Sequence, residues 1–270
     1  MESYKGIIYE GDCLDSISYI SDNSVDLVVT SPPYFDAINY EDHINKIQDD
    51  TEWWERDSGS YGEYVDFLIT RFSSVYDVVT PGGYVVVNLS PVISDSTRVP
   101  IPFHFVEWMS NLEWDFVKTI IWEKTVAVDR RSGVIIQHPY PGYYYPSIVS
   151  EYLLVFQKPA ESTAEQAQSH DDSINTDTEA VWKICPVRPS EIDHPSPFPI
   201  ELADRIITQF SPENGTILDI FGGSGQTYLS AINCNRDWIG CELLPEYVEY
   251  SLNRVIEHQS SDDIESTTAV

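Results

Sequence analysis

The segment Gly215–Thr227, with the sequence GTILDIFGGSGQT, predicts a short buried strand followed by a tight glycine-rich turn. The helix-like run 228–232 comes directly after it. Glycines in such a strand-to-helix turn let the backbone approach a ligand closely. About 20 residues farther on, the strand-like run 237–242 ends in Glu242, where dinucleotide-binding folds place an acid that holds ribose hydroxyls. Tyr228 stands where the Rossmann fingerprint has its third glycine, and no phosphate-binding lysine is present, so the turn does not favour NAD, FAD or ATP.

A second informative segment lies near the start of the chain, where the apolar run Val25–Thr30 is followed by Ser31-Pro32-Pro33-Tyr34. The run predicts a sheet strand that ends abruptly at the two prolines. Neither proline has an N–H, so the backbone there offers carbonyl acceptors and few donors. Ser31 adds a hydroxyl and Tyr34 a flat ring. This inventory suits a substrate with an amino group to be held and a planar ring to be stacked, and an exocyclic amine on a nucleobase has both.

Both segments resemble motifs of one enzyme family. Thr30–Tyr34 resembles the catalytic motif of DNA methyltransferases that modify N4 of cytosine or N6 of adenine, and Gly215–Thr227 is similar to the S-adenosylmethionine loop of methyltransferases. In most methyltransferases this loop precedes the catalytic strand, whereas here it follows by nearly the whole chain. The permuted order resembles the beta group of amino-methylating DNA enzymes and argues against protein-glutamine and RNA-guanine methyltransferases. The resemblance implies a doubly wound α/β fold, with a mostly parallel, seven-stranded, Rossmann-like sheet in a single domain, residues 1–270.

The resemblance also implies roles for individual residues. The catalytic set is Ser31, Pro32, Pro33 and Tyr34: Ser31 Oγ and the Pro32 carbonyl accept from the amine, and Tyr34 stacks on a base that must be flipped out of the duplex. For Asp219, capping of the glycine turn is an equal alternative to cofactor contact. The residues expected to bind S-adenosylmethionine are Asp12, Thr30, Pro199, Asp219, Phe221, Gly222, Gly223, Ser224, Gly225, Thr227 and Glu242.

Three functional hypotheses follow. Serine at the first position of the tetrapeptide, preceded by threonine, resembles the cytosine-N4 subgroup more than the adenine-N6 subgroup, where Asp or Asn is commoner. Site-specific methylation of cytosine N4 in duplex DNA is therefore favoured, and adenine N6 is the first alternative. An alternative of another class is a non-catalytic acidic interaction protein on a methyltransferase scaffold. No cysteine nucleophile is expected, because Cys185-Pro186 reverses the order that a 5-methylcytosine enzyme needs.

Target recognition is expected from an insertion spanning residues 124–147. It holds Lys124, Arg130, Arg131 and Tyr143, the residues expected to bind DNA. Arginine reads guanine edges through two hydrogen bonds, and aromatic rings fill the gap that a flipped base leaves. The alternative is that the arginines pair with surface acids and the tyrosines pack locally. A cognate restriction endonuclease is a further implied partner.

The composition constrains these hypotheses. The 270 residues have 44 acidic and 15 basic side chains and a formal charge of −29, which repels DNA. An acidic partner-binding protein is one explanation; the favoured one is a halophilic source, since the Debye length falls to about 3 Å in 1 M salt. Four scattered cysteines suggest reduced thiols and no metal site. The lack of a signal-like start and of a run of ~20 apolar residues predicts a cytoplasmic protein without a membrane span.

The remaining pattern predicts the other elements of an α/β domain. Helical spacing covers 64–79, 103–112, 200–210 and 245–258, and strand-like runs cover 6–12, 84–89, 117–122 and 152–156. Residues 35–62 are expected to form a loop beside the active site. Residues 160–180 are polar and acidic, which predicts a flexible loop, and residues 259–270 are expected to be a frayed tail.

Overall fold

The computed structural model describes residues 6–35, 60–94, 97–124, 148–160, 179–188, 192 and 196–268. Within this part of the chain, one sheet has eight strands and a two-stranded hairpin lies apart from it. The order across the sheet is β1 (Gly6–Glu10), β10 (Asp237–Glu242), β9 (Thr216–Asp219), β2 (Val25–Thr30), β3 (Val79–Leu89), β7 (Ser150–Gln157), β6 (Asp115–Glu123) and β8 (Val181–Lys183). The hairpin consists of β4 (Val92–Ser94) and β5 (Thr97–Val99).

The predicted mostly parallel, doubly wound sheet is confirmed, with one correction to its size. Strands β1, β10, β9, β2 and β3 run parallel to one another, while β7 is antiparallel to both β3 and β6. The prediction of seven strands missed β8, which pairs in parallel with β6. Three residues are too few to show a strand pattern, and burial of Trp182 fixes β8 instead.

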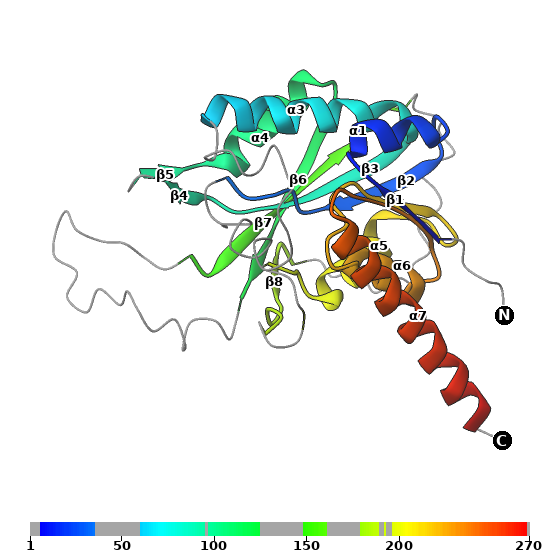
Figure 1. The fold of residues 1–270 in the computed structure, drawn as a ribbon. Coiled ribbons are helices and arrows are strands. Elements are labelled where there is room, and N and C mark those ends of the chain that lie inside the picture. The colour runs from blue at the N-terminus through cyan, green and yellow to red at the C-terminus, as the bar shows by residue number, and fades with distance from the viewer. Residues whose placement is uncertain are drawn as a thin grey trace, which may run out of the picture.

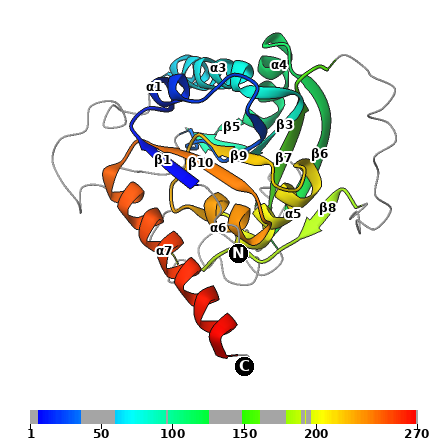
Figure 2. The same ribbon diagram turned by 90° about the vertical axis from the view of Figure 1, so that its right-hand side faces the viewer.

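Helices cover both faces of the sheet (Figures 1 and 2). One face carries α1 (Cys13–Ser16), the adjoining 3-10 turn Ile17–Tyr19, α3 (Tyr61–Val78) and α4 (Ile101–Asn111). The other face carries α5 (Ile200–Phe210), α6 (Gln226–Asn233) and α7 (Pro245–Thr268). Successive side chains of a strand point to opposite faces, so each central strand supplies both cores. In β2, Val28 packs into the core under α3, and Leu27 and Val29 pack into the core over α5 and α6.

The sheet brings together parts of the chain that lie far apart in sequence. Strand β9 pairs with β2 through Leu27 opposite Ile217 and Val28 opposite Leu218. The Asp26 carboxylate also accepts a hydrogen bond from the backbone N–H of Thr216, at 2.8 Å. The chain leaves β9 towards β10 and leaves β2 towards β3, on opposite sides of this pair. The carboxyl ends of β2 and β9 therefore form the switch point at which open α/β sheets bind ligands.

Several predicted element bounds change. Helix α3 begins at Tyr61, three residues early, because Ser60 and Glu63 form a reciprocal capping box. Helix α7 was expected to end near His258 before a frayed tail, but it continues to Thr268. After Pro245 it contains no glycine or proline that would break it. The predictions for residues 36–59, 125–147 and 161–178 lie outside the described residues.

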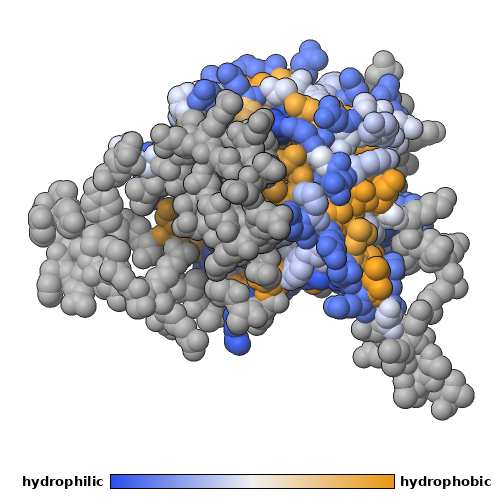
Figure 3. Space-filling model, viewed as in Figure 1, coloured by the Kyte–Doolittle hydropathy of each residue, from blue (hydrophilic) through white to orange (hydrophobic). Residues whose placement is uncertain are grey.

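The surface of the described part is mixed in polarity. Figure 3 shows hydrophilic residues over much of one face, with apolar residues gathered beside β1 and α7. Exposed apolar side chains of these two elements are Ile7, Leu252 and Ile256. Among the described helices, none is both long enough and apolar enough to cross a bilayer.

Candidate active site at the carboxyl ends of β2, β9 and β10

A buried carboxylate joins the two sequence motifs. Asp219, at the end of β9, accepts hydrogen bonds from Thr30 Oγ1 at 2.7 Å and from Thr227 Oγ1 at 2.6 Å. It also accepts from the backbone N–H of Phe221 at 3.0 Å. Thr30 precedes Ser31, and Thr227 lies in the first turn of α6 after the glycine turn. The prolines and the glycine turn therefore meet at one rim of the sheet.

Asp219 is only 1% exposed, and its two carboxylate oxygens accept from three donors of the strand end and the turn. Burial raises the pKa of this carboxyl, while the hydrogen bonds from Thr227, Thr30 and Phe221 oppose the shift. This geometry matches the alternative in which Asp219 caps the turn. Thr30, which is also predicted to bind the cofactor, donates its hydroxyl proton to Asp219.

The glycine turn needs its glycines for two different reasons. Gly223 and Gly225 have φ angles of +49° and +76°, in the left-handed region that side chains disfavour. At Gly222 a Cβ would lie 1.7 Å from Tyr228 Oη, so the ring of Tyr228 requires the glycine. Tyr228, which replaces the third Rossmann glycine, stacks on Trp238 with ring centroids 4.7 Å apart. Tyr228, whose presence does not favour a bound dinucleotide, thus fills the space between α6 and β10.

Glu242, at the end of β10, supports the turn from the other side. Its Oε2 accepts from the backbone N–H of Gly223 at 2.7 Å, and its Oε1 accepts from that of Leu244 at 2.9 Å. Burial raises the pKa of this carboxyl, and these backbone bonds oppose the shift. Each oxygen has a second lone pair, so the carboxylate can still accept hydroxyl protons.

The prolines and their neighbours form a connected group beside the turn. Ser31 Oγ donates to the backbone carbonyl of Asn88 at 3.3 Å, and the Pro33 carbonyl accepts from Tyr64 Oη at 2.9 Å. Tyr34 Oη donates to Glu151 Oε2 at 3.1 Å. Both ends of the predicted catalytic tetrapeptide are therefore held by side chains or backbone of neighbouring strands.

Two residues of this group were not predicted from the sequence. Asn88 and Glu151 lie on β3 and β7, are 5% and 6% exposed, and are joined by a 2.6 Å hydrogen bond from Asn88 Nδ2 to Glu151 Oε2. A signal existed, because Asn88 is the polar residue of the otherwise apolar run 84–89. Lys124, expected to bind DNA, forms an ion pair with Glu151 Oε1, and its ammonium lies 4.7 Å from the Trp122 ring centroid.

Asp12 lies at the carboxyl end of β1, as predicted, but its carboxylate is engaged. One oxygen caps α1 by accepting from the Leu14 N–H at 3.0 Å, and the other forms an ion pair with Arg71 of α3. The Arg71 guanidinium lies 3.7 Å from the ring centroid of Phe67, which in turn packs on Phe221 at 5.9 Å. Phe221 therefore packs on α3 at the edge of the turn, and its contact with the cofactor stays a prediction.

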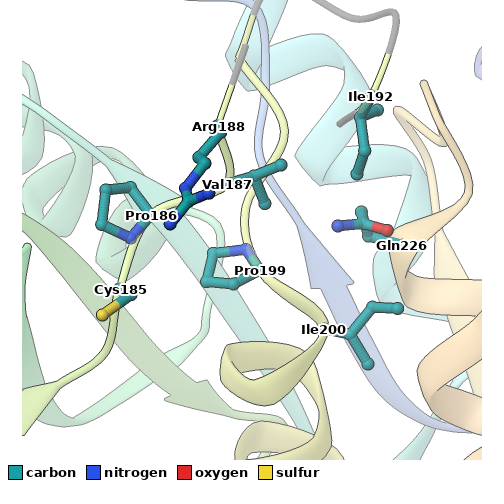
Figure 4. A pocket seen from close by; sticks show the side chains of 8 residues that line it. All are labelled: Cys185, Pro186, Val187, Arg188, Ile192, Pro199, Ile200 and Gln226. Carbon is teal, nitrogen blue, oxygen red and sulfur yellow. The ribbon is translucent and has the colours of Figure 1, made fainter. Parts of the chain in front are cut away.

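A pocket of about 450 Å³ lies next to the glycine turn (Figure 4). Cys185, Pro186, Val187 and Arg188 line one side, and Gln226 and Ile200 line the other. Pro199, predicted to contact the cofactor, and Ile192 also line it. Gln226 directly follows Gly225 and donates to the Phe198 carbonyl at 2.7 Å. The volume of the pocket is in the range of small-molecule sites.

A family model described as DNA methylase, of the N6/N4 type, matches residues 25–253, from β2 into α7. The chain belongs to this DNA methylase family. Members of the family methylate an amino group of DNA bases, N4 of cytosine or N6 of adenine, with S-adenosylmethionine. The match includes both motifs, so the resemblance of Thr30–Tyr34 and Gly215–Thr227 to this family is confirmed.

Individual DNA methylases agree with this assignment. The type II methyltransferase M.BglII of Bacillus subtilis is 26% identical over 254 residues, covering 90% of this chain and 66% of its own length. The DNA modification methylase TTHA0409 of Thermus thermophilus, solved with S-adenosyl-L-methionine, has a TM-score of 0.67 at 25% identity, covering 95% and 94% of the chains. The cytosine-N4-specific PvuII DNA methyltransferase shares the fold, with a TM-score of 0.68 at 20% identity over 93% and 86%.

The described residues fit the cofactor of this DNA methylase family. Glu242, a carboxylate with lone pairs to spare, suits ribose hydroxyls. The turn has no side chain at Gly222, Gly223 and Gly225, so its backbone is open to a ligand there. Ser224, 3% exposed, lies within this turn. The turn meets Ser31 through Thr30 and Asp219. The predicted DNA contacts Arg130, Arg131 and Tyr143 lie outside the described residues.

Proposed function

We propose that this DNA methylase transfers a methyl group from S-adenosylmethionine to N4 of cytosine at a specific site in duplex DNA. The main support is the Thr30–Asp219 hydrogen bond, which joins the end of the proline motif to the glycine turn across 189 residues of sequence. A methyl donor held by the turn and an amine held by Ser31 would then be neighbours. The preference for cytosine rests on the Thr30-Ser31 sequence.

The hydrogen bonds of the proline motif support its role as an acceptor. Ser31 gives its hydroxyl proton to the Asn88 carbonyl, so the Oγ lone pairs remain for an N–H of the amine. The Pro33 carbonyl already accepts from Tyr64, and the Pro32 carbonyl is the second acceptor proposed for the amine. Two acceptors on the two N–H groups bias the amine nitrogen towards a tetrahedral shape, with its lone pair aimed at the methyl carbon.

The reaction needs no protein nucleophile. S-adenosylmethionine supplies a methyl group already activated on a sulfonium. The amine nitrogen forms the new C–N bond as the sulfur–carbon bond breaks, the bonding pair remains on sulfur, and the amine releases one proton to water. The contribution of the chain is to hold the nitrogen in line with the methyl carbon and to keep the base there by stacking on Tyr34. Because the amine is inaccessible inside a duplex, the base must be flipped.

Contacts with DNA outside the proline motif are part of the proposal. Arg130, Arg131 and Tyr143 would read the target sequence, and a restriction endonuclease of the same specificity would be the biological partner. Mapping which restriction sites become protected on a plasmid from an expressing host identifies the target sequence.

Mass spectrometry of nucleosides from the same plasmid tests the proposed base. N4-methylcytosine is expected. N6-methyladenine instead would support the alternative of an adenine enzyme. If neither appears, and calorimetry in about 1 M salt detects no S-adenosylmethionine binding, the protein is the non-catalytic alternative.

A further inference from the structure

Glu151 is a buried carboxylate next to the predicted catalytic tetrapeptide, and no sequence motif accounts for it. Its side chain is 8% exposed at the start of β7. Oε2 accepts from Tyr34 Oη at 3.1 Å and from Asn88 Nδ2 at 2.6 Å, and Oε1 pairs with the Lys124 ammonium. All three neighbours come from different strands or loops at one rim of the sheet.

Stability alone does not explain such a group. Removing a carboxylate from water is costly even when it is paired, and replacing a buried ion pair with apolar residues is often neutral or stabilising. An apolar pair at the positions of Glu151 and Lys124 would fill the same space. The bonds to Tyr34 and Asn88 are what such a pair would lose.

These bonds reach both ends of the tetrapeptide. The bond to Tyr34 Oη fixes the rotation of the ring that is proposed to stack on the base. The bond from Asn88 Nδ2 fixes the side chain of the residue whose backbone carbonyl accepts from Ser31 Oγ. The same bond sets the orientation of the Asn88 side-chain amide, whose Oδ1 is buried and has no hydrogen-bond partner within the described residues.

The ion pair also lies at the base of the predicted recognition insertion. Lys124 is the first residue of this insertion, and its backbone N–H donates to the Val149 carbonyl at 2.8 Å. In the β6–β7 ladder Trp122 is paired with Glu151. Lys124 and Glu151 thus lie where the chain leaves for residues 125–147 and returns.

We propose that Glu151 is a positioning residue for methyl transfer, which orients the Tyr34 ring and supports the Ser31 acceptor while Lys124 neutralises its charge. This role rests on the proposed function. In this role Glu151 acts through its bonds to Tyr34 and Asn88, and not through the base or the methyl donor. Its loss should therefore slow the transfer step and leave the affinity for S-adenosylmethionine unchanged.

The test is a single-turnover assay with full-length protein, duplex DNA containing the mapped target, and isotopically labelled S-adenosylmethionine. The transfer rate of Glu151→Gln should fall by about tenfold or more, because small misplacements of reacting groups are costly, while the Kd for S-adenosylmethionine stays within about twofold. Tyr34→Phe removes the same bond from the other side. The double variant should therefore be less impaired than the product of the two single effects.

Two further variants keep the result interpretable. Glu151→Leu with Lys124→Met replaces the ion pair by apolar groups and leaves no buried charge unpaired, so this variant should fold. Its transfer should still be slow, because Tyr34 and Asn88 have lost their acceptor. Glu201→Gln removes a carboxylate from the exposed ion pair with Arg205 on α5, and its rate should match wild type.

Each outcome decides between the claims. If the Glu151→Leu/Lys124→Met variant folds and transfers the methyl group as fast as wild type, the role of Glu151 is overturned while the proposed function stands. If the rate losses of Glu151→Gln and Tyr34→Phe multiply in the double variant, the link between these two residues is overturned. Wild-type protein that methylates no base overturns the proposed function, and this role with it.

Discussion

Replacing Thr30 by valine tests the hydrogen bond that joins the two motifs. Valine keeps the branched shape and suits a strand, so the change removes one hydroxyl from a side chain that is 1% exposed. The lost bond is the 2.7 Å contact from Oγ1 to Asp219 Oδ1. Asp219 would keep its bonds from Thr227 and Phe221.

The expected cost follows from the environment of Asp219. A hydrogen bond to a charged group contributes roughly 1.5–3 kcal/mol, and two remaining donors limit the loss, so the free energy of unfolding should fall by about 2 kcal/mol. With a urea m-value near 3 kcal/mol/M, the midpoint shifts by about 0.7 M.

Urea unfolding followed by circular dichroism and tryptophan fluorescence measures this shift. The control is Thr70→Val on α3, which removes an exposed hydroxyl bonded to the Asp66 carbonyl and should change stability by less than about 0.5 kcal/mol. The reasoning is refuted if Thr30→Val is as stable as wild type, or if Thr70→Val loses as much.

Four other expectations follow from the same structure. Tyr228→Phe should raise the free energy of unfolding by about 1 kcal/mol, since the buried Tyr228 hydroxyl has no hydrogen-bond partner in the described part of the chain; a lower urea midpoint would contradict this. Burial raises the pKa of Asp219 above its usual 3.8, so its contribution to stability is full below that value and is lost as pH rises through the folded pKa. Asp219→Asn should therefore flatten the decline in unfolding free energy above about pH 4, and equal slopes in urea titrations across pH would count against the shift. The charge of −29 should make the urea midpoint rise between about 0.1 M and about 1 M KCl, whereas a protein insensitive to salt would not fit the halophilic hypothesis. Tyr34→Ala should impair methyl transfer far more than it lowers the melting temperature, and intact activity would contradict the stacking role.

Local sequence patterns predicted the strands around the site. The runs 25–30 and 237–242 are predicted with the observed bounds of β2 and β10, because strands buried in a parallel sheet are mainly apolar. Their meeting could be inferred only from the resemblance of the two motifs to one family, since no local pattern states that β9 pairs with β2.

The contacts that support the site could not be predicted in this way. Glu151 and Asn88, which are hydrogen-bonded to each other, are 63 residues apart in sequence, and Arg71, which forms an ion pair with Asp12, is 59 residues away from it. Such partners depend on the strand order, in which β7 lies next to β3. Short elements were missed for a different reason: β8 has three residues, and tertiary packing of Trp182 determines it.

The most direct measurement is transfer of a deuterated methyl group from S-adenosylmethionine to duplex DNA by purified protein, read by mass spectrometry of the nucleosides. Wild-type protein should produce labelled N4-methylcytosine, and Ser31→Ala, still folded and still binding S-adenosylmethionine, should produce far less. A wild-type preparation that binds S-adenosylmethionine but labels no exocyclic amine, or a Ser31→Ala variant with undiminished labelling, would contradict the account.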